Sequence, residues 1–418
     1  MKHTVAVIGG GASGMTAALC AAKGGAAVCI YEKNDRVGKK LLATGNGKCN
    51  FTNLLLEENS YNGGGKEQIH KILESFSPRD CIAYFESMGM LTKEKNGYLY
   101  PASEQASTVL DLLRMQLGFY GVCVKADCEI VRLCEENGEY RLFGYRDGKK
   151  ESFSAEKVII AAGSIAGIKN NGRSDPYGLL RTLKLPLVPV APALVQLCCG
   201  EAYLKAVAGV RLQACISLCI DGKPVCRETG EVQLTDYGVS GIPVFQLSRF
   251  AAYGLLEKRK VQVHINSLPG FTDEAYKSFR KNRRIQNGEQ SAEEYFLGIC
   301  HKKLIQLWLK LSGIRPGEKA KDIPKEKMEA MFGYFRDFPL TVEKTNSFSQ
   351  AQVCAGGLAM EAVDENLQLH RYPGVYVTGE LLDVDGRCGG YNLQWAFASG
   401  YTAGTHAAAQ QKKAGKGI

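Results

Sequence analysis

A short run of β-branched and apolar residues leads directly into a glycine motif at the start of the chain. Residues 4–8 have the composition of a buried parallel strand, and Gly9, Gly11 and Gly14 follow in the spacing G-x-G-x-x-G. The first glycine suits a tight turn, the second lets another group approach the backbone, and the third lets a helix pack closely on the strand. The motif therefore fixes a strand, a turn and a helix in one order.

The residues after this motif complete the pattern of a Rossmann unit. A helical pattern over 13–23 precedes a second strand over 27–31, which ends in Glu32, at the spacing where such a unit places the carboxylate that binds an adenosine ribose. The helix would offer free N–H groups and a positive dipole end to phosphates. The pattern predicts a dinucleotide site, and Glu32 favours an unphosphorylated ribose, as in FAD or NAD. The predicted cofactor contacts in this segment are Gly9, Gly11, Ala12, Ser13, Gly14 and Glu32.

A long segment rich in glycine and asparagine follows Glu32. Residues 33–53 exceed an ordinary connection, and their basic side chains and backbone amides suit a loop over a pyrophosphate and a ribityl chain. An NAD dehydrogenase does not need such a loop, so the segment favours FAD. A surface loop with a basic flank is the alternative. The predicted contacts here are Lys33, Lys40, Gly45, Gly47, Cys49 and Asn50.

Two further short strands end in glycine. Residues 158–163 resemble the strand that closes over FAD in flavoproteins with two dinucleotide folds, although Ala162 replaces the usual threonine. Residues 374–380 end in a glycine and an acid, as in flavoproteins whose carboxylate meets a ribityl hydroxyl. The predicted contacts in these two segments are Ala162, Gly163, Gly379 and Glu380.

A glycine-rich turn near the C-terminus leads into another helical pattern. Residues 383–392 form the turn, and the pattern continues over 393–409. A helix that starts in this way aims N–H groups and a positive dipole end at the N1 and C2-carbonyl edge of a flavin, which stabilises the anionic reduced form. The cofactor site would then be built from both ends of the chain. The predicted contacts here are Asp385, Gly386, Gly390, Tyr391, Asn392 and Leu393.

The middle of the chain has a different pattern. Residues 193–267 read as short alternating strands, and residues 270–340 as helices, of which 292–311 is the clearest. We expect an α/β fold with a discontinuous, Rossmann-like FAD domain of two dinucleotide folds, an inserted antiparallel β-barrel-like domain and a small helical domain. The expected domains are 1–190 with 346–418, 191–268 and 269–345.

Composition argues against several classes of protein. The chain has 418 residues and a net charge of +9, but no basic stretch is interleaved with aromatic residues, so nucleic acid is not an expected partner. No apolar run is long enough for a membrane span. The 15 cysteines are odd in number and lack C-x-x-C pairs, which predicts reduced thiols in the cytoplasm. No histidines have ligand spacing, and no metal site is predicted.

Together, these motifs resemble the bacterial FAD-dependent flavoprotein family that includes aminoacetone oxidase and the flavoprotein reductase of the bile-acid-inducible N type. Two departures concern substrate contacts, because Thr235-Asp236 stands where the family often has Thr-His, and residues 366–370 replace a usual Thr-Met-Glu-Ser-Lys segment. The stretches that carry the resemblance span nearly the whole chain: residues 7–14, 45–53, 238–241, 355–357 and 379–394.

The resemblance implies hydride transfer between flavin N5 and a substrate carbon. The protein then needs to add only a proton donor or acceptor for the neighbouring atom. By resemblance, residues 237–243 would form part of the substrate wall at the isoalloxazine, whereas the simpler interpretation is a helix capped by Ser240. The sequence singles out no acid, and the weak candidates are Tyr237, Tyr391, Cys49, Lys48 and Asp236.

Three functions stay open at this point. The first is an FAD-dependent reductase that uses NAD(P)H to saturate a conjugated C=C bond of a small molecule. Its candidate substrates are 3-oxo-4,6-diene bile-acid intermediates. The second is an amine oxidase of the aminoacetone type, which would pass electrons to O2 and form H2O2. The third is a non-catalytic flavin-binding or RNA-associated module. Since no second strand-G-x-G-x-x-G-helix unit exists, a nicotinamide donor would bind transiently at the open flavin face.

Overall fold

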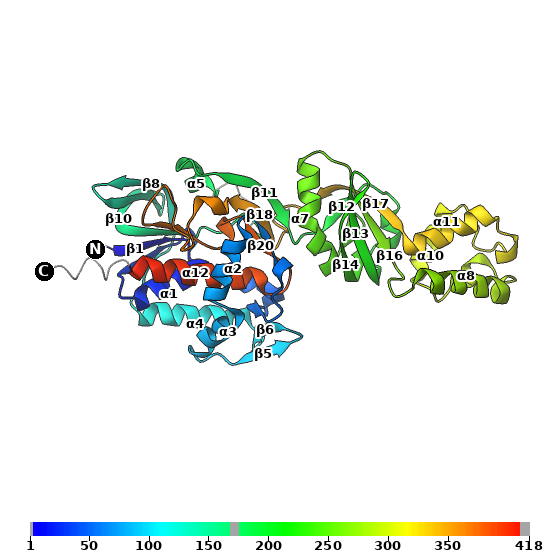
Figure 1. Ribbon diagram of the computed structural model, residues 1–418, viewed down its shortest axis with the longest axis horizontal. Coiled ribbons are helices and arrows are strands. Elements are labelled where there is room, and N and C mark those ends of the chain that lie inside the picture. Colours follow the sequence, from blue (N-terminus) through cyan, green and yellow to red (C-terminus); the bar gives the residue numbers. More distant parts are fainter. Residues whose placement is uncertain (1–2, 168–174, 410–418) are drawn as a thin grey trace. The chain divides into compact units, whose positions relative to one another are not determined.

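A computed structural model describes residues 3–167 and 175–409 of the chain (Figure 1). It divides into two compact units, of which the first contains residues 1–190 and 353–418 and the second contains residues 191–352. The second unit is therefore an insertion in the first.

A seven-stranded sheet forms the centre of the first unit. Its order is β7-β2-β1-β10-β9-β8, and β19 pairs with the end of β10. Residues of β1 and β2 are almost all buried, as expected for parallel strands covered on both faces. The strands are β1 (His3–Ile8), β2 (Val28–Tyr31), β7 (Cys123–Lys125), β8 (Cys128–Glu136), β9 (Glu139–Arg146), β10 (Lys149–Ile160) and β19 (Val375–Val377).

Strand β10 changes its type of pairing along its length. Its first half is antiparallel to β9, from Lys149 opposite Arg146 to Ala155 opposite Tyr140. Its last residues are parallel to both β1 and β19. Because parallel strands end at the same edge of a sheet, the turns that follow β1, β2, β10 and β19 gather along one edge.

Helices and three small sheets complete the first unit. The 3₁₀ segments are η1 (Leu41–Gly47), η2 (Glu58–Ser60), η4 (Met360–Ala362) and η5 (Gly379–Leu381). The sheets are β3 (Thr52–Asn53), β6 (Tyr98–Pro101) and β5 (Thr92–Lys95); β4 (Tyr61–Gly63) with β20 (Val384–Gly386); and β11 (Leu187–Ala193) with β18 (Val353–Leu358). The helices are α1 (Ala12–Lys23), α2 (Lys66–Ser75), α3 (Pro78–Glu86), α4 (Ala106–Phe119), α5 (Gly178–Thr182) and α12 (Tyr391–Ala409).

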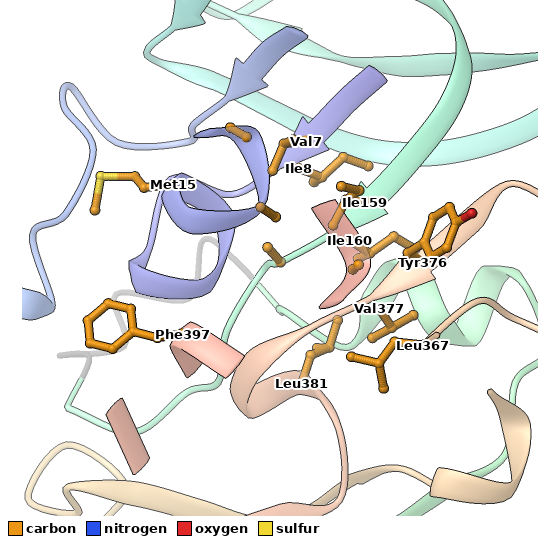
Figure 2. Packing of buried hydrophobic residues seen from close by; sticks show 14 of the residues in the cluster. Val7, Ile8, Met15, Ile159, Ile160, Leu367, Tyr376, Val377, Leu381 and Phe397 are labelled. Atoms are coloured by element: carbon orange, nitrogen blue, oxygen red, sulfur yellow. The ribbon is translucent and has the colours of Figure 1, made fainter. Parts of the chain in front are cut away.

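Helices α1 and α12 lie against each other and come from opposite ends of the chain, blue and red in Figure 1. A Cβ atom at Gly400 would overlap the backbone oxygen of Ser13, and one at Gly404 would overlap that of Ala17. The two backbones therefore approach more closely than larger side chains would permit. Met15 of α1 and Phe397 of α12, both labelled in Figure 2, are fully buried.

The second unit is built on a closed antiparallel barrel. Burial alternates along β13 and β16, so that one face of each strand lines the barrel core. This architecture and the parallel sheet of the first unit confirm the predicted fold class. The barrel order is β12 (Leu197–Cys199), β15 (Gly238–Ser240), β14 (Lys223–Leu234), β13 (Arg211–Ile220), β16 (Val261–Asn266) and β17 (Phe338–Thr345), and α6 (Leu204–Val207) and α7 (Ile242–Leu256) accompany it.

A helical segment joins β16 to β17. Its aromatic residues share one hydrophobic cluster with the barrel, and Trp308 contacts Phe338 of β17 with ring centroids 5.5 Å apart. The division of this unit into separate domains over 191–268 and 269–345 stays a prediction. The elements are α8 (Asp273–Asn287), α9 (Ala292–Phe296), α10 (Lys302–Leu311), η3 (Ala320–Asp322) and α11 (Lys325–Arg336).

The prediction of one helix over 292–311 was wrong. The structure has two helices there, α9 and α10, with an interruption over 297–301. Gly298 in the interruption has a φ of +83°, which is incompatible with a continuous α-helix. His301 then starts α10, since its ring nitrogen accepts a hydrogen bond from the Lys303 N–H at 3.2 Å.

Candidate functional site

The turn between β1 and α1 leaves open space in front of a helix N-terminus. Gly9 has a φ of +104°, and a Cβ atom there would overlap the backbone oxygen of Ala161. Gly14 lies against Gly9 in the same way. At Gly11, by contrast, no heavy atom of the described residues lies within 4 Å of the Cβ position. The turn is therefore tight on its inner side and accessible at Gly11, where α1 begins without a side-chain cap.

Glu32 is held beside this turn at the end of β2. Its Oε2 accepts a hydrogen bond from the Gly10 N–H at 2.7 Å, and its Oε1 accepts from the Asn34 N–H at 2.9 Å. Only 6% of Glu32 is exposed. These bonds hold the carboxylate beside the turn, and its assignment as a ribose ligand stays a prediction. Lys33 follows it and is partly buried.

Hydrogen bonds join the asparagine-rich segment to the C-terminal turn. The Asn53 Nδ2 donates to the Gly389 backbone oxygen at 2.8 Å, and the Thr52 hydroxyl donates to the Gln394 Oε1 at 2.6 Å. The Gln394 Nε2 in turn donates to the Phe76 backbone oxygen at 2.7 Å. Segments more than 300 residues apart in the chain are therefore held together by buried polar side chains.

Asn50 lies at the point where these two segments meet. Its Oδ1 is buried and has no hydrogen-bond partner among the residues that the structure describes. A Cβ atom at Gly390 would lie 2.7 Å from this oxygen. The two segments are therefore so close that position 390 has no room for a side chain. An unpaired buried acceptor is costly unless a ligand or water satisfies it.

The turn before α12 is stabilised by its own side chains. The Asn392 Oδ1 accepts from the Gly386 N–H at 2.8 Å, and its Nδ2 donates to the Gly386 oxygen at 2.9 Å. The Tyr391 hydroxyl donates to the Leu55 oxygen at 2.7 Å. The predicted contacts Asn392 and Tyr391 thus shape the turn through their side chains, and Leu393 is partly buried behind them.

Lys40 and Glu380 form an ion pair at the same edge of the sheet. The Lys40 Nζ lies 2.6 Å from the Glu380 Oε2 and 3.5 Å from the hydroxyl of Ser164, which follows the end of β10. The other oxygen of the carboxylate, Oε1, accepts from the Cys354 N–H at 3.1 Å. The predicted contacts Lys40 and Glu380 therefore meet, although 340 positions separate them.

Asp385 is buried on β20, where its Oδ2 accepts from the Asn62 Nδ2 at 3.3 Å. Gly163 has open space at its Cβ position within the described residues, and Ala162 next to it is partly buried. All of the predicted cofactor contacts lie in the first unit. Sequence reasoning missed Thr52, Asn53 and Gln394 as the residues that join the segments, although they stand inside the motifs themselves.

The candidate proton donors lie in different surroundings. Cys49 is fully buried, and burial raises the pKa of its thiol to about 11, so it stays protonated at neutral pH. Burial also raises the pKa of Tyr391. Lys48 is exposed and pairs with Glu104 at 2.8 Å. Tyr237 and Asp236 belong to the second unit, and their approach to the first-unit site stays a prediction.

These residues fit a dinucleotide with a flavin. The open space at Gly11 and Gly163 allows a phosphate chain to approach the backbone, and the start of α1 supplies donors for it. The unpaired Asn50 oxygen, beside the turn that starts α12, offers an acceptor for a ring N–H. FAD presents these groups in this order along one extended molecule.

Comparison with known proteins finds a family and relatives that match nearly the whole chain. A family model described as HI0933-like protein Rossmann domain matches residues 3–406. The 3-dehydro-bile acid delta(4,6)-reductase of Clostridium scindens is 39% identical over 97% of this chain and 99% of the relative. The ribosomal RNA dihydrouridine synthase of Haemophilus influenzae is 25% identical over 94% of this chain and 96% of the relative.

A solved structure agrees in fold. The 3-ketosteroid delta1-dehydrogenase from Sterolibacterium denitrificans, in complex with 1,4-androstadiene-3,17-dione, aligns with a TM-score of 0.51 and 12% identity over 98% of this chain and 100% of that chain. At this identity the likeness concerns the fold alone. Among the helices of residues 3–167 and 175–409, none has both the length and the apolar character to cross a membrane.

Proposed function

Because this chain belongs to the HI0933-like Rossmann-domain family, we propose that it is an FAD-dependent oxidoreductase that uses NAD(P)H to saturate a conjugated C=C bond. The resemblance seen in the motifs is thereby confirmed. The observation that carries the proposal is the convergence of four turns from both ends of the chain along one edge of the sheet. The likeness to the bile-acid reductase over nearly the full length of both chains supports 3-oxo-4,6-diene steroids as the first substrates to test.

The chain's own contribution is to bind, orient and exclude water. FAD, when bound, supplies hydride transfer at N5. The start of α1 would hold the pyrophosphate, and Glu32 would hold the adenosine ribose. Asn392 keeps the Gly386 turn in one conformation, so that the donors at the start of α12 point in a fixed direction. Buried Gln394 and Thr52 keep water from separating the two segments.

An anaerobic titration tests this proposal. NADH or NADPH added to the oxidised holoprotein is expected to bleach the flavin band at ~450 nm, and a 3-oxo-4,6-diene steroid is expected to restore it. The control is the same protein with a saturated 3-oxo steroid, which offers no C=C bond to reduce. If neither nicotinamide bleaches the band and an amine does so with H2O2 formed in air, the amine oxidase alternative replaces the proposal.

A second candidate substrate is a uracil base within RNA. Relatives that span nearly this whole chain are named ribosomal RNA dihydrouridine synthase, and the C5=C6 bond of uracil is conjugated to a carbonyl, as in an enone. The second unit also carries 23 of the 52 basic residues against 17 acidic ones, which suits an anionic partner. Mass mapping of ribosomal RNA after incubation with the reduced protein tests this. A uridine that gains two hydrogen atoms favours RNA, and an unchanged RNA removes this candidate.

A further inference from the structure

We propose that Lys40 is a positioning residue that cancels the charge of Glu380 inside the cofactor site, so that the site tolerates a cofactor that becomes more negative on reduction. The inference rests on the proposed function, because it requires FAD at the edge of the sheet. It concerns the charge balance of the site and the reduction potential of the bound cofactor.

Glu380 belongs to a strand end that lies beside the start of α1. Glu380 follows β19, and its neighbour Gly379 lies so close to α1 that a Cβ atom there would be 2.5 Å from the Ser13 hydroxyl. Ser13 stands in the first turn of α1, beside the open space at Gly11. The strand end that carries Glu380 therefore lies next to the turn that would hold the pyrophosphate.

The Glu380 carboxylate is fixed from two sides. The Cys354 N–H at the start of β18 binds its Oε1, and the Lys40 ammonium binds its Oε2 at 2.6 Å. The glutamate side chain is 19% exposed. A backbone N–H brings no net charge, so the neutralisation of this carboxylate depends on Lys40.

The thiol beside the pair adds no charge. Burial, and to a smaller extent the negative charge of Glu380, together raise the pKa of Cys354 to about 11. The Cys354 thiol is therefore protonated at neutral pH. Lys40 and Glu380 thus set the net charge at this end of the site, which is zero while both are ionised.

Removal of Lys40 would leave one negative charge at a partly buried position. FAD brings two negative charges on its pyrophosphate and gains another when its reduced form is anionic. Like charges at partly buried positions repel each other more strongly than they do in water. The loss of Lys40 should therefore weaken FAD binding and disfavour reduction, whereas the loss of the Glu380 charge should favour reduction.

The adjacent residue provides a matched control. Lys39 is 42% exposed, and Lys40 is 41% exposed. Lys39 also binds a carboxylate, that of Asp35 at 2.7 Å, but this pair is local and lies on the surface, with Asp35 63% exposed. Replacement of either lysine changes the net charge of the protein by the same amount, so only a local effect distinguishes them.

The test measures the potential of bound FAD by equilibration with a reference dye, together with the dissociation constant of FAD from the apoprotein. In Lys40→Met we expect about tenfold less reduced flavin at the same dye ratio and about tenfold weaker binding, which is the effect of ~1.4 kcal/mol. Glu380→Gln should shift the dye equilibrium toward reduced flavin. The double variant Lys40→Met/Glu380→Gln should return close to the native potential, Lys40→Arg should retain it, and Lys39→Met should not change it.

The signs of the shifts decide the outcome. If Lys40→Met and Glu380→Gln both lower the potential, or if Lys39→Met matches Lys40→Met, the charge-balance role is wrong. The double variant has no charge at either position and keeps the test decisive if Lys40→Met alone does not fold, since a potential far from native would also overturn the inference. If the native protein binds no FAD, the proposed function fails instead, and the two failures are distinguishable.

Discussion

At the scale of single residues, the buried side-chain amides decide whether the cofactor segments meet. Gln394 binds both Thr52 and Phe76, and Asn53 binds the oxygen of Gly389. The sequence motifs identify both segments, because their glycines and asparagines are local signals. The partners of each amide lie more than 300 positions away, and neither periodicity nor spacing carries that information.

Gln394→Leu should be strongly destabilising. Gln394 is fully buried, and the leucine would leave the Thr52 hydroxyl and the Phe76 oxygen without their partner, at a combined cost of about 2–4 kcal/mol. Chemical denaturation monitored by fluorescence measures this change. As a control, Gln286→Leu at an exposed position of α8 should change the free energy of unfolding by less than ~0.5 kcal/mol. Equal effects of the two substitutions would contradict the structural role of Gln394.

At the scale of elements, local patterns and tertiary contacts carry different amounts of information. The strands β1, β2 and β19 and the helices α1 and α12 follow from runs of apolar residues and from glycine motifs, and the structure has them close to the predicted bounds. The double role of β10 was not predictable, because the change from antiparallel to parallel pairing depends on three other strands. The break between α9 and α10 was hidden by continuous amphipathic spacing, although Gly298 marked it.

The close contact between α1 and α12 predicts that one added methyl group there lowers the free energy of unfolding. Gly404→Ala should lower the free energy of unfolding by about 2 kcal/mol, because the new Cβ would overlap the Ala17 backbone oxygen. Unlike a flexible side chain, the backbone cannot relieve this overlap by changing its rotamer. The matched control is Gly118→Ala in α4, where no described heavy atom lies within 4 Å of the Cβ position. That substitution should stabilise the protein by about 0.5–1 kcal/mol. Thermal melting of both variants checks the prediction, and a stable Gly404→Ala protein would show that the helices are not in close contact.

At the scale of the whole molecule, the buried thiols predict sensitivity to alkaline pH. None of the fifteen cysteines, all of which lie in the described residues, forms a disulfide, and burial raises the pKa of Cys20 and Cys29 to about 12 and that of Cys49 and Cys128 to about 11. Above pH ~9 the unfolded chain loses these protons while the folded chain keeps them. The unfolded state then binds fewer protons, so stability falls as pH rises.

Between pH 7 and pH 10, each such thiol should lower the free energy of unfolding by about 1 kcal/mol. The decrease continues until the pH exceeds the pKa of the thiol in the folded protein. The melting temperature should therefore decline steadily from pH 8 to pH 10.5. Replacement of the fully buried Cys49 by alanine should reduce the slope of this decline, after correction for the loss of stability at pH 7. A melting temperature that is constant over this range would contradict the burial of the thiols.

The pairing of β11 with β18 has a consequence for the inserted segment. The chain leaves the first unit along β11 and returns along β18, and these two strands are hydrogen-bonded neighbours. The ends of the intervening 191–352 segment are close together, since the Gln352 N–H donates to the Leu194 oxygen at 3.3 Å. A short linker could therefore replace the whole segment, and changes of sequence within it would leave the strand pairing of the first unit intact.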